Sequence, residues 1–262
     1  MANINTTEKE QIEAIRNSFR TQASNFDSSN MNFTKQEFLD YTIRAIELKE
    51  SDGVLEVAAG TCACGRSIAP FVREVTCLDI TPEMLQIGKE AAQKQGLTNM
   101  KFVVGDATEI SLEEKSYDVV ISRLAFHHML HPERVFSEMK RMLKLGGKLV
   151  LIDMEATKEE FRDTEDEIEK MRDYSHVKNL SKEELIALYR NEELEVLKCE
   201  TTKIPVSLEA WMELTNTPGS IREDITNRML QEINGGSATG FEPYENNEQL
   251  YFNQRWILIV GK

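Results

Sequence analysis

Three acidic residues stand at the ends of successive apolar segments of this sequence. Asp79 follows Glu56 by 23 positions, and Asp106 follows Asp79 by 27. A carboxylate has two oxygens that accept hydrogen bonds, so an acid at the second position could hold both hydroxyl groups of a ribose. An acid at the third position could accept from an adenine amino group. The spacing predicts a nucleoside site, although each acid alone could cap the next helix.

The segment that follows the first acid is poor in large side chains. An apolar strand predicted over 54–58 runs into a turn of small residues around Gly60, where the backbone can approach a ligand closely. The next helix directs free N–H groups toward the same place. A dinucleotide-binding turn would carry G-x-G-x-x-G, but Ala58 and Cys62 occupy the glycine positions on either side of Gly60. A ligand without a pyrophosphate is therefore favoured.

Two adjacent histidines, His127 and His128, follow the fourth predicted strand. Imidazole titrates near neutral pH, so either residue could remove a proton from a substrate, and we favour His128. Packing or capping within the loop is an equally good explanation for each histidine alone. Together with Asp153 and His176 they could also bind a metal ion, but the sequence lacks a histidine or cysteine pair at zinc spacing, and we predict no metal.

The cysteines are predicted to be reduced thiols rather than disulfides or metal ligands. Cys62 stands near a helix N-terminus, which can lower the pKa of a thiol and make it reactive. The interpretation that we favour is a small residue packed beside a ligand. The cysteines are Cys62, Cys64, Cys77 and Cys199.

The order of the predicted elements brings the acids and histidines together. Two helices, over 7–22 and 34–48, precede the first strand. Strands and helices then alternate, which is typical of a parallel sheet with helices on both faces. Ligands of such sheets bind at the carboxyl ends of the strands. The strands are predicted at 54–58, 74–80, 101–104, 117–122 and 148–153, and the helices between them at 65–72, 82–95 and 132–145.

The second half of the chain is predicted to complete the sheet and add helices beside it. A charged segment over 155–173 is predicted to be a solvated helix outside the sheet. We predict a single structural domain with an N-terminal helical cover over 1–50, a cofactor-binding core over 51–155 and substrate-side elements over 156–262. The remaining predicted elements are helices at 181–190 and 207–236, strands at 194–204 and 250–260, and a loop over 234–249.

The composition argues against several classes of partner. The chain of 262 residues has a formal net charge of -14 and a sequence pI near 4.9, unlike a nucleic-acid surface built from clustered lysine and arginine. No apolar run approaches the roughly 18–20 residues that span a bilayer, and residues 1–10 lack the apolar core of a signal peptide. We therefore expect a cytoplasmic protein that binds a small molecule and no nucleic acid.

Several short segments together resemble one enzyme family. They are 54–60 (VLEVAAG), 78–85 (LDITPEML), 105–107 (GDA), 117–120 (YDVV) and 143–149 (LKLGGKL), with 123–128 (RLAFHH) and 172–177 (RDYSHV) as further matches. The combination, which extends over most of the chain, is similar to class I S-adenosylmethionine-dependent methyltransferases. It resembles in particular the quinone-biosynthesis (UbiE-like) branch, whose members act on small molecules.

The resemblance implies a fold, a cofactor and a set of binding residues. The fold is a Rossmann-like, doubly wound α/β sheet of seven mostly parallel strands with an antiparallel last strand. The cofactor is S-adenosylmethionine, and S-adenosylhomocysteine is the product. The implied cofactor-binding residues are Glu56, Ala58, Gly60 and Cys62 near the methionine part, Asp79 on the ribose, Ile80 or Met84 against the adenine face, Asp106 and Ala107 at the adenine edge, and Arg123 near the carboxylate. The family usually has glycine where Cys62 stands, so this side chain could narrow the pocket or weaken cofactor binding.

Two further segments could enclose the site. The stretch 19–26 resembles the family's cover over the cofactor, and Phe19 or Phe26 could shield the sulfonium from water. The segment 207–251 is expected to form an apolar and aromatic wall of the acceptor pocket. The wall candidates are Trp211, Met212, Phe241 and Tyr244. Each of these residues could equally be part of the core.

The sequence thus predicts an enzyme that methylates a small, hydrophobic or aromatic molecule. It leaves open whether carbon, nitrogen, oxygen or sulfur is methylated, and how many subunits assemble. The first alternative is a cofactor-binding module without catalysis, acting as a sensor or through a partner. The second is a nicotinamide-dependent oxidoreductase, which the turn around Gly60 and the Asp106-Ala107 pair disfavour.

Overall fold

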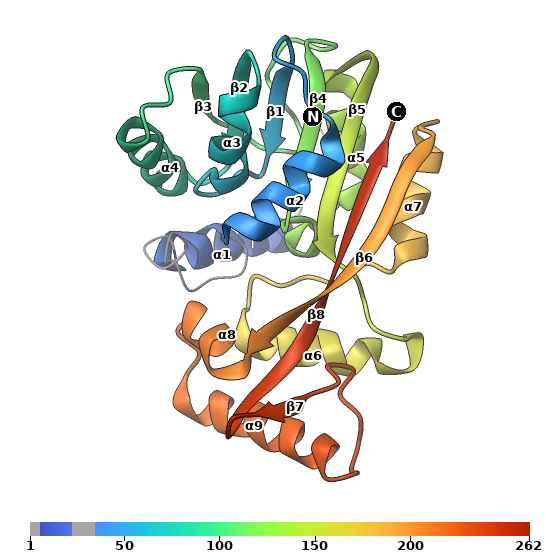
Figure 1. Ribbon diagram of the computed structural model, residues 1–262. Coiled ribbons are helices and arrows are strands. Elements are labelled where there is room, and N and C mark those ends of the chain that lie inside the picture. The colour runs from blue at the N-terminus through green and yellow to red at the C-terminus, as the bar shows by residue number, and fades with distance from the viewer. Residues whose placement is uncertain (1–5, 23–34) are drawn as a thin grey trace.

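One mixed sheet forms the centre of the protein (Figure 1). The computed structural model describes residues 6–22 and 35–262. Within them the strand order is β3-β2-β1-β4-β5-β8-β6, with a short strand, β7, paired to β8. Strands β1 to β5 pair in parallel, whereas β8 runs antiparallel to β5 and β6. The strands are β1 (Gly53–Val57), β2 (Glu74–Asp79), β3 (Met100–Val104), β4 (Tyr117–Arg123), β5 (Leu143–Met154), β6 (Val196–Ser207), β7 (Tyr244–Asn246) and β8 (Gln249–Gly261).

This topology confirms the predicted Rossmann-like α/β class with its antiparallel last strand. The additional strand, β7, forms a hairpin with β8 inside a segment that the sequence predicted to be loop. A three-residue strand carries too little periodicity to be recognised from sequence.

Helices cover both faces of the sheet. Every residue of β1 is buried, as expected of a strand enclosed on both sides. On one face Val54 and Ile121 pack with α2, α3 and α4, and on the other Leu55 and Val120 pack with α5 and α7. These helices are α2 (Gln36–Ile46), α3 (Ala63–Ile68), α4 (Pro82–Lys94), α5 (Pro132–Met142) and α7 (Lys182–Asn191).

The long strands β6 and β8 carry a second layer of helices. They span 12 and 13 residues and extend past the carboxyl ends of the central strands (Figure 1). Helices α6 (Arg162–Arg172), α8 (Leu208–Leu214) and α9 (Gly219–Ile233) pack against this extension. Ile168, Trp211, Ile225 and Phe252 belong to the apolar cluster that joins them. The carboxyl ends of β1 and β4 therefore face the second layer.

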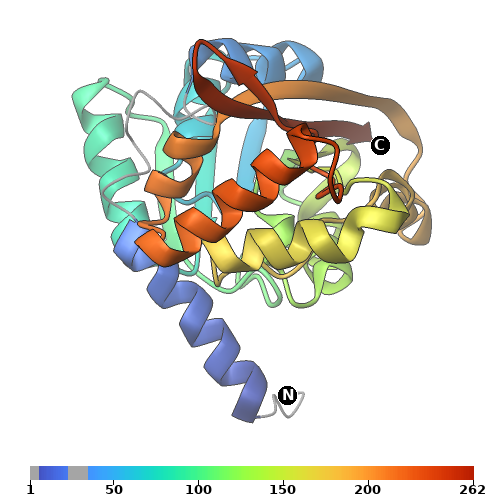
Figure 2. The ribbon, with the colours of Figure 1, turned by 90° about the horizontal axis from the view of Figure 1, so that it is seen from below.

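Helix α1 (Thr6–Gln22) lies beside the same edge of the sheet. Figure 2 shows its first turns extending beyond the rest of the molecule. Its last turn contacts α4, where Nε of Arg20 lies 3.0 Å from Oε1 of Glu83. Phe26, the second aromatic residue of the predicted cover, lies outside the described residues. Of the helices described here, α1 included, none combines the length and apolarity needed to cross a bilayer.

The charged segment after β5 is not the solvated helix that its sequence predicted. Helix α6 is shorter than expected, and it buries Glu165, Glu169 and Arg172. Glu165 forms an ion pair with Arg255 of β8, and Glu169 lies 3.1 Å from Arg172. Part of the alternating charge therefore forms buried ion pairs, one of them to β8, while Asp163, Glu167 and Lys170 remain exposed.

Of two other predicted helices, one is divided in two and one ends earlier than expected. The segment predicted as one helix over 207–236 forms α8 and α9, because Pro218 lacks an N–H group and disfavours helical backbone at Thr217. Helix α5 ends at Met142 because Leu143 already pairs with Tyr117 as the first residue of β5.

Candidate active site

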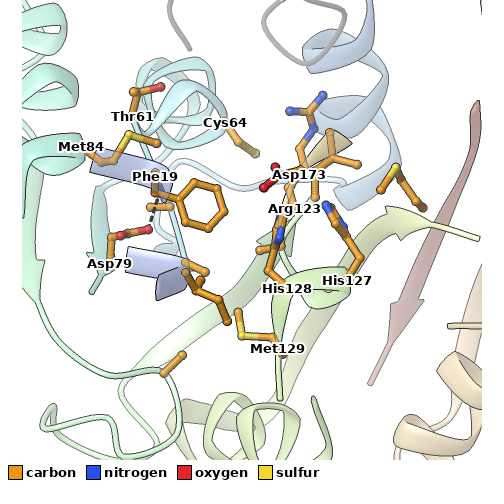
Figure 3. A pocket seen from close by; sticks show the side chains of 18 of the residues that line it. Phe19, Thr61, Cys64, Asp79, Met84, Arg123, His127, His128, Met129 and Asp173 are labelled. Carbon is orange, nitrogen blue, oxygen red and sulfur yellow. Dashed lines mark hydrogen bonds between the residues drawn. The ribbon is translucent and has the colours of Figure 1, made fainter. Parts of the chain in front are cut away.

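A cavity of about 660 Å³ lies between the central sheet and the second layer. The loops after β1, β2, β3 and β4 line one part of it, and α1, α8 and the strands β6 and β8 line another. Several of the lining side chains are visible in Figure 3. All the predicted site residues except Cys62 contribute to the lining, namely Glu56, Ala58, Gly60, Asp79, Ile80, Met84, Asp106, Ala107, Arg123, His127 and His128.

The loop between β1 and α3 has an unusual backbone. Ala58, Gly60 and Cys62 have φ angles of 55°, 53° and 59°, so two residues with side chains adopt the left-handed region that favours glycine. The loop is held by the bond from Ala59 N to Leu78 O at 3.0 Å. The alternating left-handed residues fold the loop tightly, so its backbone reaches the cavity.

Asp79 joins two loops at the cavity edge. Its Oδ2 accepts from Gly60 N at 2.7 Å and its Oδ1 accepts from Thr81 N at 2.8 Å. Burial raises the pKa of Asp79, although these backbone bonds oppose the shift. An ionised carboxylate can accept about four hydrogen bonds, so both oxygens retain capacity for a ligand.

Glu56 lies deeper beneath the same loop. Its Oε2 accepts from Gly65 N at 2.9 Å and lies 3.5 Å from the thiol of Cys77. Complete burial raises the pKa of Glu56 to about 7, against the opposing effects of these hydrogen bonds and of Arg123. The carboxyl group therefore titrates close to neutral pH.

Cys62 does not have the position expected from sequence. Its side chain is fully buried beneath the loop, and its thiol donates to Gly60 O at 3.6 Å. The left-handed backbone at this residue turns the thiol away from the cavity, and Cys64 lines the cavity instead. The neighbouring Cys77 thiol lowers the pKa of Cys62, but burial and the carboxylates of Glu56 and Asp79 outweigh it and raise this pKa above its ordinary value. Cys62 is therefore not among the residues that line the cavity, and its raised pKa favours the thiol form.

The loops after β2 and β3 form the far end of the cavity. Asp106 accepts two hydrogen bonds from Thr108 at one oxygen, at 2.7 and 2.8 Å. Gly105 N donates to Asp79 O at 3.0 Å, which links the two loops. Met84 is buried against the first loop, so that a Cβ added at Gly60 would lie 3.4 Å from its Cε. Backbone and small side chains thus border this end, with Met84 as its apolar floor.

Arg123 lies where the acids and the aromatic residues meet. Its guanidinium carbon is 5.3 Å from the ring centroid of Trp256, within the range of a cation–π interaction. Burial lowers the pKa of Arg123, and the nearby Cys64 and Glu56 oppose this effect. The group still carries its charge at neutral pH, because an arginine loses its proton only in strong base.

Asp153 at the end of β5 organises the turn after β4. Its Oδ1 lies 2.5 Å from Nδ1 of His127, and its Oδ2 accepts from the N–H groups of Ala125 and Phe126 at 2.9 and 2.6 Å. These residues lead into the short 3-10 helix Phe126–His128. Because an ionised carboxylate only accepts, Nδ1 of His127 carries a proton.

His128 is held by a different set of groups. Its Nδ1 lies 3.0 Å from Ser175 O and 3.1 Å from Ser175 Oγ. Its ring contacts the ring of Phe19 edge-on, with centroids 4.8 Å apart. Burial and the neighbouring His127 lower the pKa of His128. The side chain is therefore neutral at neutral pH.

Only one of the four predicted wall residues lines the cavity. Trp211 of α8 does so, whereas Met212 and Phe241 belong to the apolar cluster behind it. Tyr244 instead stacks on Tyr251 in the β7–β8 hairpin, with ring centroids 6.0 Å apart. The sequence showed that these residues were apolar or aromatic, but it could not show which side of α8 and the hairpin faces inward.

Phe19, a candidate residue of the predicted cover, lines the cavity, and other lining residues were not predicted from the sequence. Ile12 and Ile15 share one side of α1 with Phe19, as their helical spacing indicates, and both line the cavity. Val206 of β6 and Trp256 of β8 complete the apolar boundary. The helical spacing of the apolar residues in α1 could have indicated that they share one face. The positions of Val206 and Trp256 depend on how far β6 and β8 extend, which the sequence does not show.

The groups considered as metal ligands do not converge. Across residues 6–22 and 35–262, the one group of three potential ligands within 4.8 Å of one another is Glu56, Cys62 and Cys77. His127 and His128 are instead engaged through Nδ1 with Asp153 and Ser175.

Comparisons with known proteins identify the family. A family model for a methyltransferase domain matches residues 55–151. The sequence is 26% identical over 235 residues to an uncharacterized methyltransferase of Bacillus subtilis, YcgJ, spanning 87% of this chain and 91% of the relative. It is 30% identical over 158 residues to an uncharacterized protein of Escherichia coli, YafE, spanning 60% of this chain and 76% of the relative. This chain belongs to the S-adenosylmethionine-dependent methyltransferases.

Two further comparisons agree with this assignment. The crystal structure of the Bacillus subtilis YcgJ protein has a TM-score of 0.78 at 25% identity, spanning 86% of this chain and 97% of that one. The ubiquinone/menaquinone biosynthesis C-methyltransferase UbiE of Zymomonas mobilis is 26% identical over 153 residues, spanning 57% of this chain and 63% of the relative. The predicted family, enzyme class and cofactor, S-adenosylmethionine, are confirmed.

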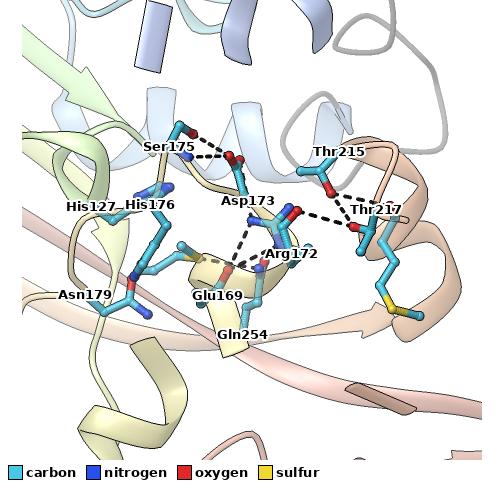
Figure 4. A network of polar contacts seen from close by, with 12 residues as sticks. His127, Glu169, Arg172, Asp173, Ser175, His176, Asn179, Thr215, Thr217 and Gln254 are labelled. Atoms are coloured by element: carbon cyan, nitrogen blue, oxygen red, sulfur yellow. Dashed lines mark hydrogen bonds and ion pairs between the residues drawn. The ribbon is translucent and has the colours of Figure 1, made fainter. Parts of the chain in front are cut away.

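Two residues near the predicted histidines belong to a segment that the sequence singled out without giving them a role. Asp173 and Ser175 lie in a matching segment and are joined to each other (Figure 4), and Oγ of Ser175 lies 3.1 Å from Nδ1 of His128. Ser18 of α1 also reaches Asp173, with Oγ 3.3 Å from Oδ1. The sequence offered no signal for this contact, because it joins residues 155 positions apart.

Proposed function

We propose that this methyltransferase transfers a methyl group from S-adenosylmethionine to a small molecule with a hydrophobic or aromatic body. The observation that carries the proposal is the continuity of the cavity, which joins the acidic strand ends around Asp79 to the apolar boundary around Trp211. A donor and an acceptor could therefore lie together in one enclosed space.

The residues present fit the cofactor. Its nucleoside presents hydroxyl and amino donors, and Asp79 and Asp106 are acceptors at the cavity edge. The lining between them is backbone or methyl groups at Gly60, Gly105 and Ala107, which leaves room for close approach. We assign the ribose to Asp79 and the adenine edge to Asp106 and Ala107.

The other assignments follow from position along the cavity. Ile80 and Met84 would contact the adenine face. Glu56, with Ala58 and Gly60, would border the methionine part, and the cation of Arg123 would attract its carboxylate.

The acceptor would occupy the part of the cavity between α1 and α8. Ile12, Ile15 and Trp211 form apolar boundaries there, and the rings of His128 and Phe19 lie at the junction of the two parts. An apolar lining with a few directed polar groups is typical of sites for small molecules.

The chain's own contribution to the chemistry is positioning and exclusion of water. Bound S-adenosylmethionine supplies an electrophilic methyl group on a sulfonium. Phe19 and the apolar wall would keep water from this group, and the loop around Gly60 would fix the donor in line with the acceptor. His127 and His128 stand where a proton lost by the acceptor could be received.

Two measurements, made one after the other, test the proposal. Calorimetric titrations with S-adenosylhomocysteine and with NADH should show binding of the first ligand only. Release of S-adenosylhomocysteine is then followed across quinols, phenols, thiols and amines of increasing apolar size. Turnover that improves with the apolar body of the acceptor supports the proposal, whereas turnover confined to small charged acceptors contradicts it.

A further inference from the structure

His128, Ser175 and Asp173 form a connected polar chain at the edge of the cavity. Figure 3 shows His128 and Asp173, and Figure 4 shows the contact between Ser175 and Asp173. Ser175 Oγ lies 3.1 Å from Nδ1 of His128 and donates to Oδ1 of Asp173 at 2.6 Å. The backbone N–H of Ser175 donates to the same carboxylate oxygen at 2.9 Å. Ser175 thus bridges the imidazole and the carboxylate through its hydroxyl group.

The directions of these hydrogen bonds fix the imidazole tautomer. The carbonyl oxygen of Ser175, 3.0 Å from Nδ1, can only accept a hydrogen bond. The hydroxyl hydrogen of Ser175 is used on Asp173, so its oxygen also accepts from the imidazole. Nδ1 of His128 therefore carries the hydrogen, and Nε2 keeps a lone pair. Within residues 6–22 and 35–262, Nε2 has no hydrogen-bond partner, and the side chain lines the cavity.

We infer that Ser175 and Asp173 position His128 so that its Nε2 accepts the proton that the methyl acceptor loses. The inference rests on the proposed transfer to a small-molecule acceptor. As the acceptor's electron pair forms the bond to the methyl carbon, the carbon–sulfur bond breaks with its pair left on sulfur. The acceptor's proton goes to Nε2, which turns His128 into an imidazolium.

Asp173 supplies the negative charge that such an imidazolium needs. It is 4% exposed, and its ionised form is retained because Arg172, His128 and Ser175 lower the pKa of Asp173 against the effect of burial. In a buried site of low dielectric constant, a fixed carboxylate stabilises a developing cation without rearrangement. Ser175 and Asp173 act through His128, so both are positioning residues.

The other charged or titratable groups near His128 do not take the place of Asp173 as the carboxylate that faces its imidazole. His127 packs against His128 with ring centroids 4.0 Å apart, and its Nδ1 is bound to Asp153. The ring centroid of His176 lies 5.9 Å from that of His127, and its Nε2 pairs with Asp166 at 2.8 Å. Arg172 pairs with Glu169 at 3.1 Å, and the same guanidinium nitrogen lies 3.9 Å from Oδ2 of Asp173, opposite the oxygen that Ser175 contacts. Asp173 is therefore the carboxylate that faces His128 through Ser175.

Helix α1 contributes to the same unit through two consecutive residues. Ser18 contacts Asp173, and Phe19 covers the ring of His128. The hydroxyl group adds a bond to the carboxylate, and the aromatic ring shields the imidazole from water. The contacts that hold and cover His128, Ser175 and Asp173 therefore include Ser18 and Phe19 of α1.

Nuclear magnetic resonance of the full chain with ¹⁵N-labelled histidine tests the positioning directly. Only four imidazoles contribute, and His128→Asn assigns the signal of interest. We expect His128 to be a neutral Nδ1–H tautomer from pH 8 to pH 5. Asp173→Asn should reduce the Nδ1–H fraction, because the hydroxyl group of Ser175 is then released to donate to Nδ1. Asp166→Asn, which alters the neighbouring His176 pair, is the matched control and should leave the His128 signal in place. An Nε2–H tautomer in the unaltered protein would overturn the inference.

Two acceptors that differ in acidity test the proton transfer. 4-Methylphenol must lose a proton on methylation, whereas thiophenol is already ionised near neutral pH. His128→Asn should lower kcat for the phenol by about 10²-fold, with a much smaller effect on the thiol and on the Kd for S-adenosylhomocysteine. Ser175→Ala and Asp173→Asn should show the same selective loss to a lesser extent, and Ser175→Thr should restore phenol turnover. Equal losses with both acceptors would overturn the inference. Absence of turnover with every acceptor counts against the proposed function, and the tautomer measurement then decides the positioning on its own.

Discussion

Oδ1 of Asp153 lies 2.5 Å from Nδ1 of His127, and this contact joins the end of β5 to the turn after β4. The same carboxylate accepts from the backbone N–H groups of Ala125, Phe126 and Met154. Asp153 is 1% exposed, so protein groups replace its hydration. Burial opposes ionisation, but His127 and the N–H donors hold the pKa of Asp153 below its usual range. A buried carboxylate thus shapes the turn that presents both histidines.

Asp153→Asn should destabilise the protein even though it preserves side-chain size. The new NH₂ group faces other donors, and each buried donor left unpaired costs about 1–3 kcal/mol. Urea denaturation at neutral pH should show this loss, whereas the exposed Asp163→Asn should change the free energy of unfolding by less than about 0.5 kcal/mol. Because the folded pKa is lowered, the stabilisation is present above the ordinary carboxyl pKa of about 3.9. It disappears as the pH falls through the folded pKa, so the difference between the two proteins should shrink in acid. A difference that stays constant in strong acid would contradict this account.

The contribution of Glu56 to the free energy of unfolding should depend on pH in the opposite direction. Burial raises its pKa to about 7, so between its unfolded pKa and this value the unfolded chain loses the proton while the folded protein keeps it. The contribution of Glu56 to stability is therefore present below the unfolded pKa and is lost as the pH rises through about 7. Glu56→Gln keeps an acceptor for Gly65 N and removes the titration. Stability measured from pH 5 to 8 should fall less steeply in this variant than in the unaltered protein and in the exposed control Glu90→Gln. Parallel curves in all three proteins would show that Glu56 ionises normally.

Asp79→Ala should remove most of the affinity for S-adenosylhomocysteine. Each charge-assisted hydrogen bond to the ligand contributes about 1.5–3 kcal/mol, and the loops that Asp79 joins at Gly60 and Thr81 lose their common acceptor. Calorimetry gives the dissociation constant, and Asp79→Asn, which keeps one acceptor oxygen, should lie between the two proteins. Unchanged affinity in Asp79→Ala would place the ribose elsewhere. Asp163→Ala on the surface of α6 is the control for an unspecific effect of removing a carboxylate.

Much of the sheet was predictable because a strand that is buried on both faces consists of consecutive apolar residues. Continuous apolar runs such as 149–152 marked the central strands, and glycine or proline beside such segments marked where elements begin or end. The second layer was not predictable in the same way. Helix α6 carries alternating charges, and only the tertiary packing of Arg255 against Glu165 shows that part of this charge is buried.

The candidate site likewise contains residues that the sequence revealed and residues that only tertiary packing reveals. The acids Asp79 and Asp106 were recognisable because a parallel sheet brings strand ends to one edge. The orientation of Cys62 depends on a φ angle that its residue type does not favour, so no sequence rule could supply it. The bridge of Ser175 between His128 and Asp173 depends on how the segment after α6 packs against the turn after β4, which local patterns do not encode.

The left-handed residues of the first loop should respond differently to glycine. Ala58 has a φ angle of 55°, and a side chain in this region costs about 1–2 kcal/mol. Ala58→Gly removes that cost, and part of the gain is offset by the greater freedom of glycine in the unfolded chain. We expect a higher melting temperature and a net stabilisation of about 0.5–1 kcal/mol. Ala59, which does not have a positive φ angle, is the matched control. Ala59→Gly should lower the melting temperature, and the same direction of change in both variants would contradict the role of the backbone.

Gly88 of α4 should be intolerant of a methyl group because of where its helix contacts the first loop. A Cβ at this position would lie 2.7 Å from Thr61 O and 2.9 Å from Sγ of Cys62. Alanine in place of glycine within a helix normally gains about 0.5–1 kcal/mol, but the clash with backbone cannot be relieved without displacing the loop. Gly88→Ala should therefore lower both the melting temperature and the affinity for S-adenosylhomocysteine. Gly219, at the start of α9, has no atom within 4 Å of its added Cβ, so Gly219→Ala should leave the affinity unchanged and the stability equal or higher. If Gly88→Ala binds S-adenosylhomocysteine with full affinity, the cofactor does not depend on the loop conformation that Ala58, Gly60 and Cys62 create.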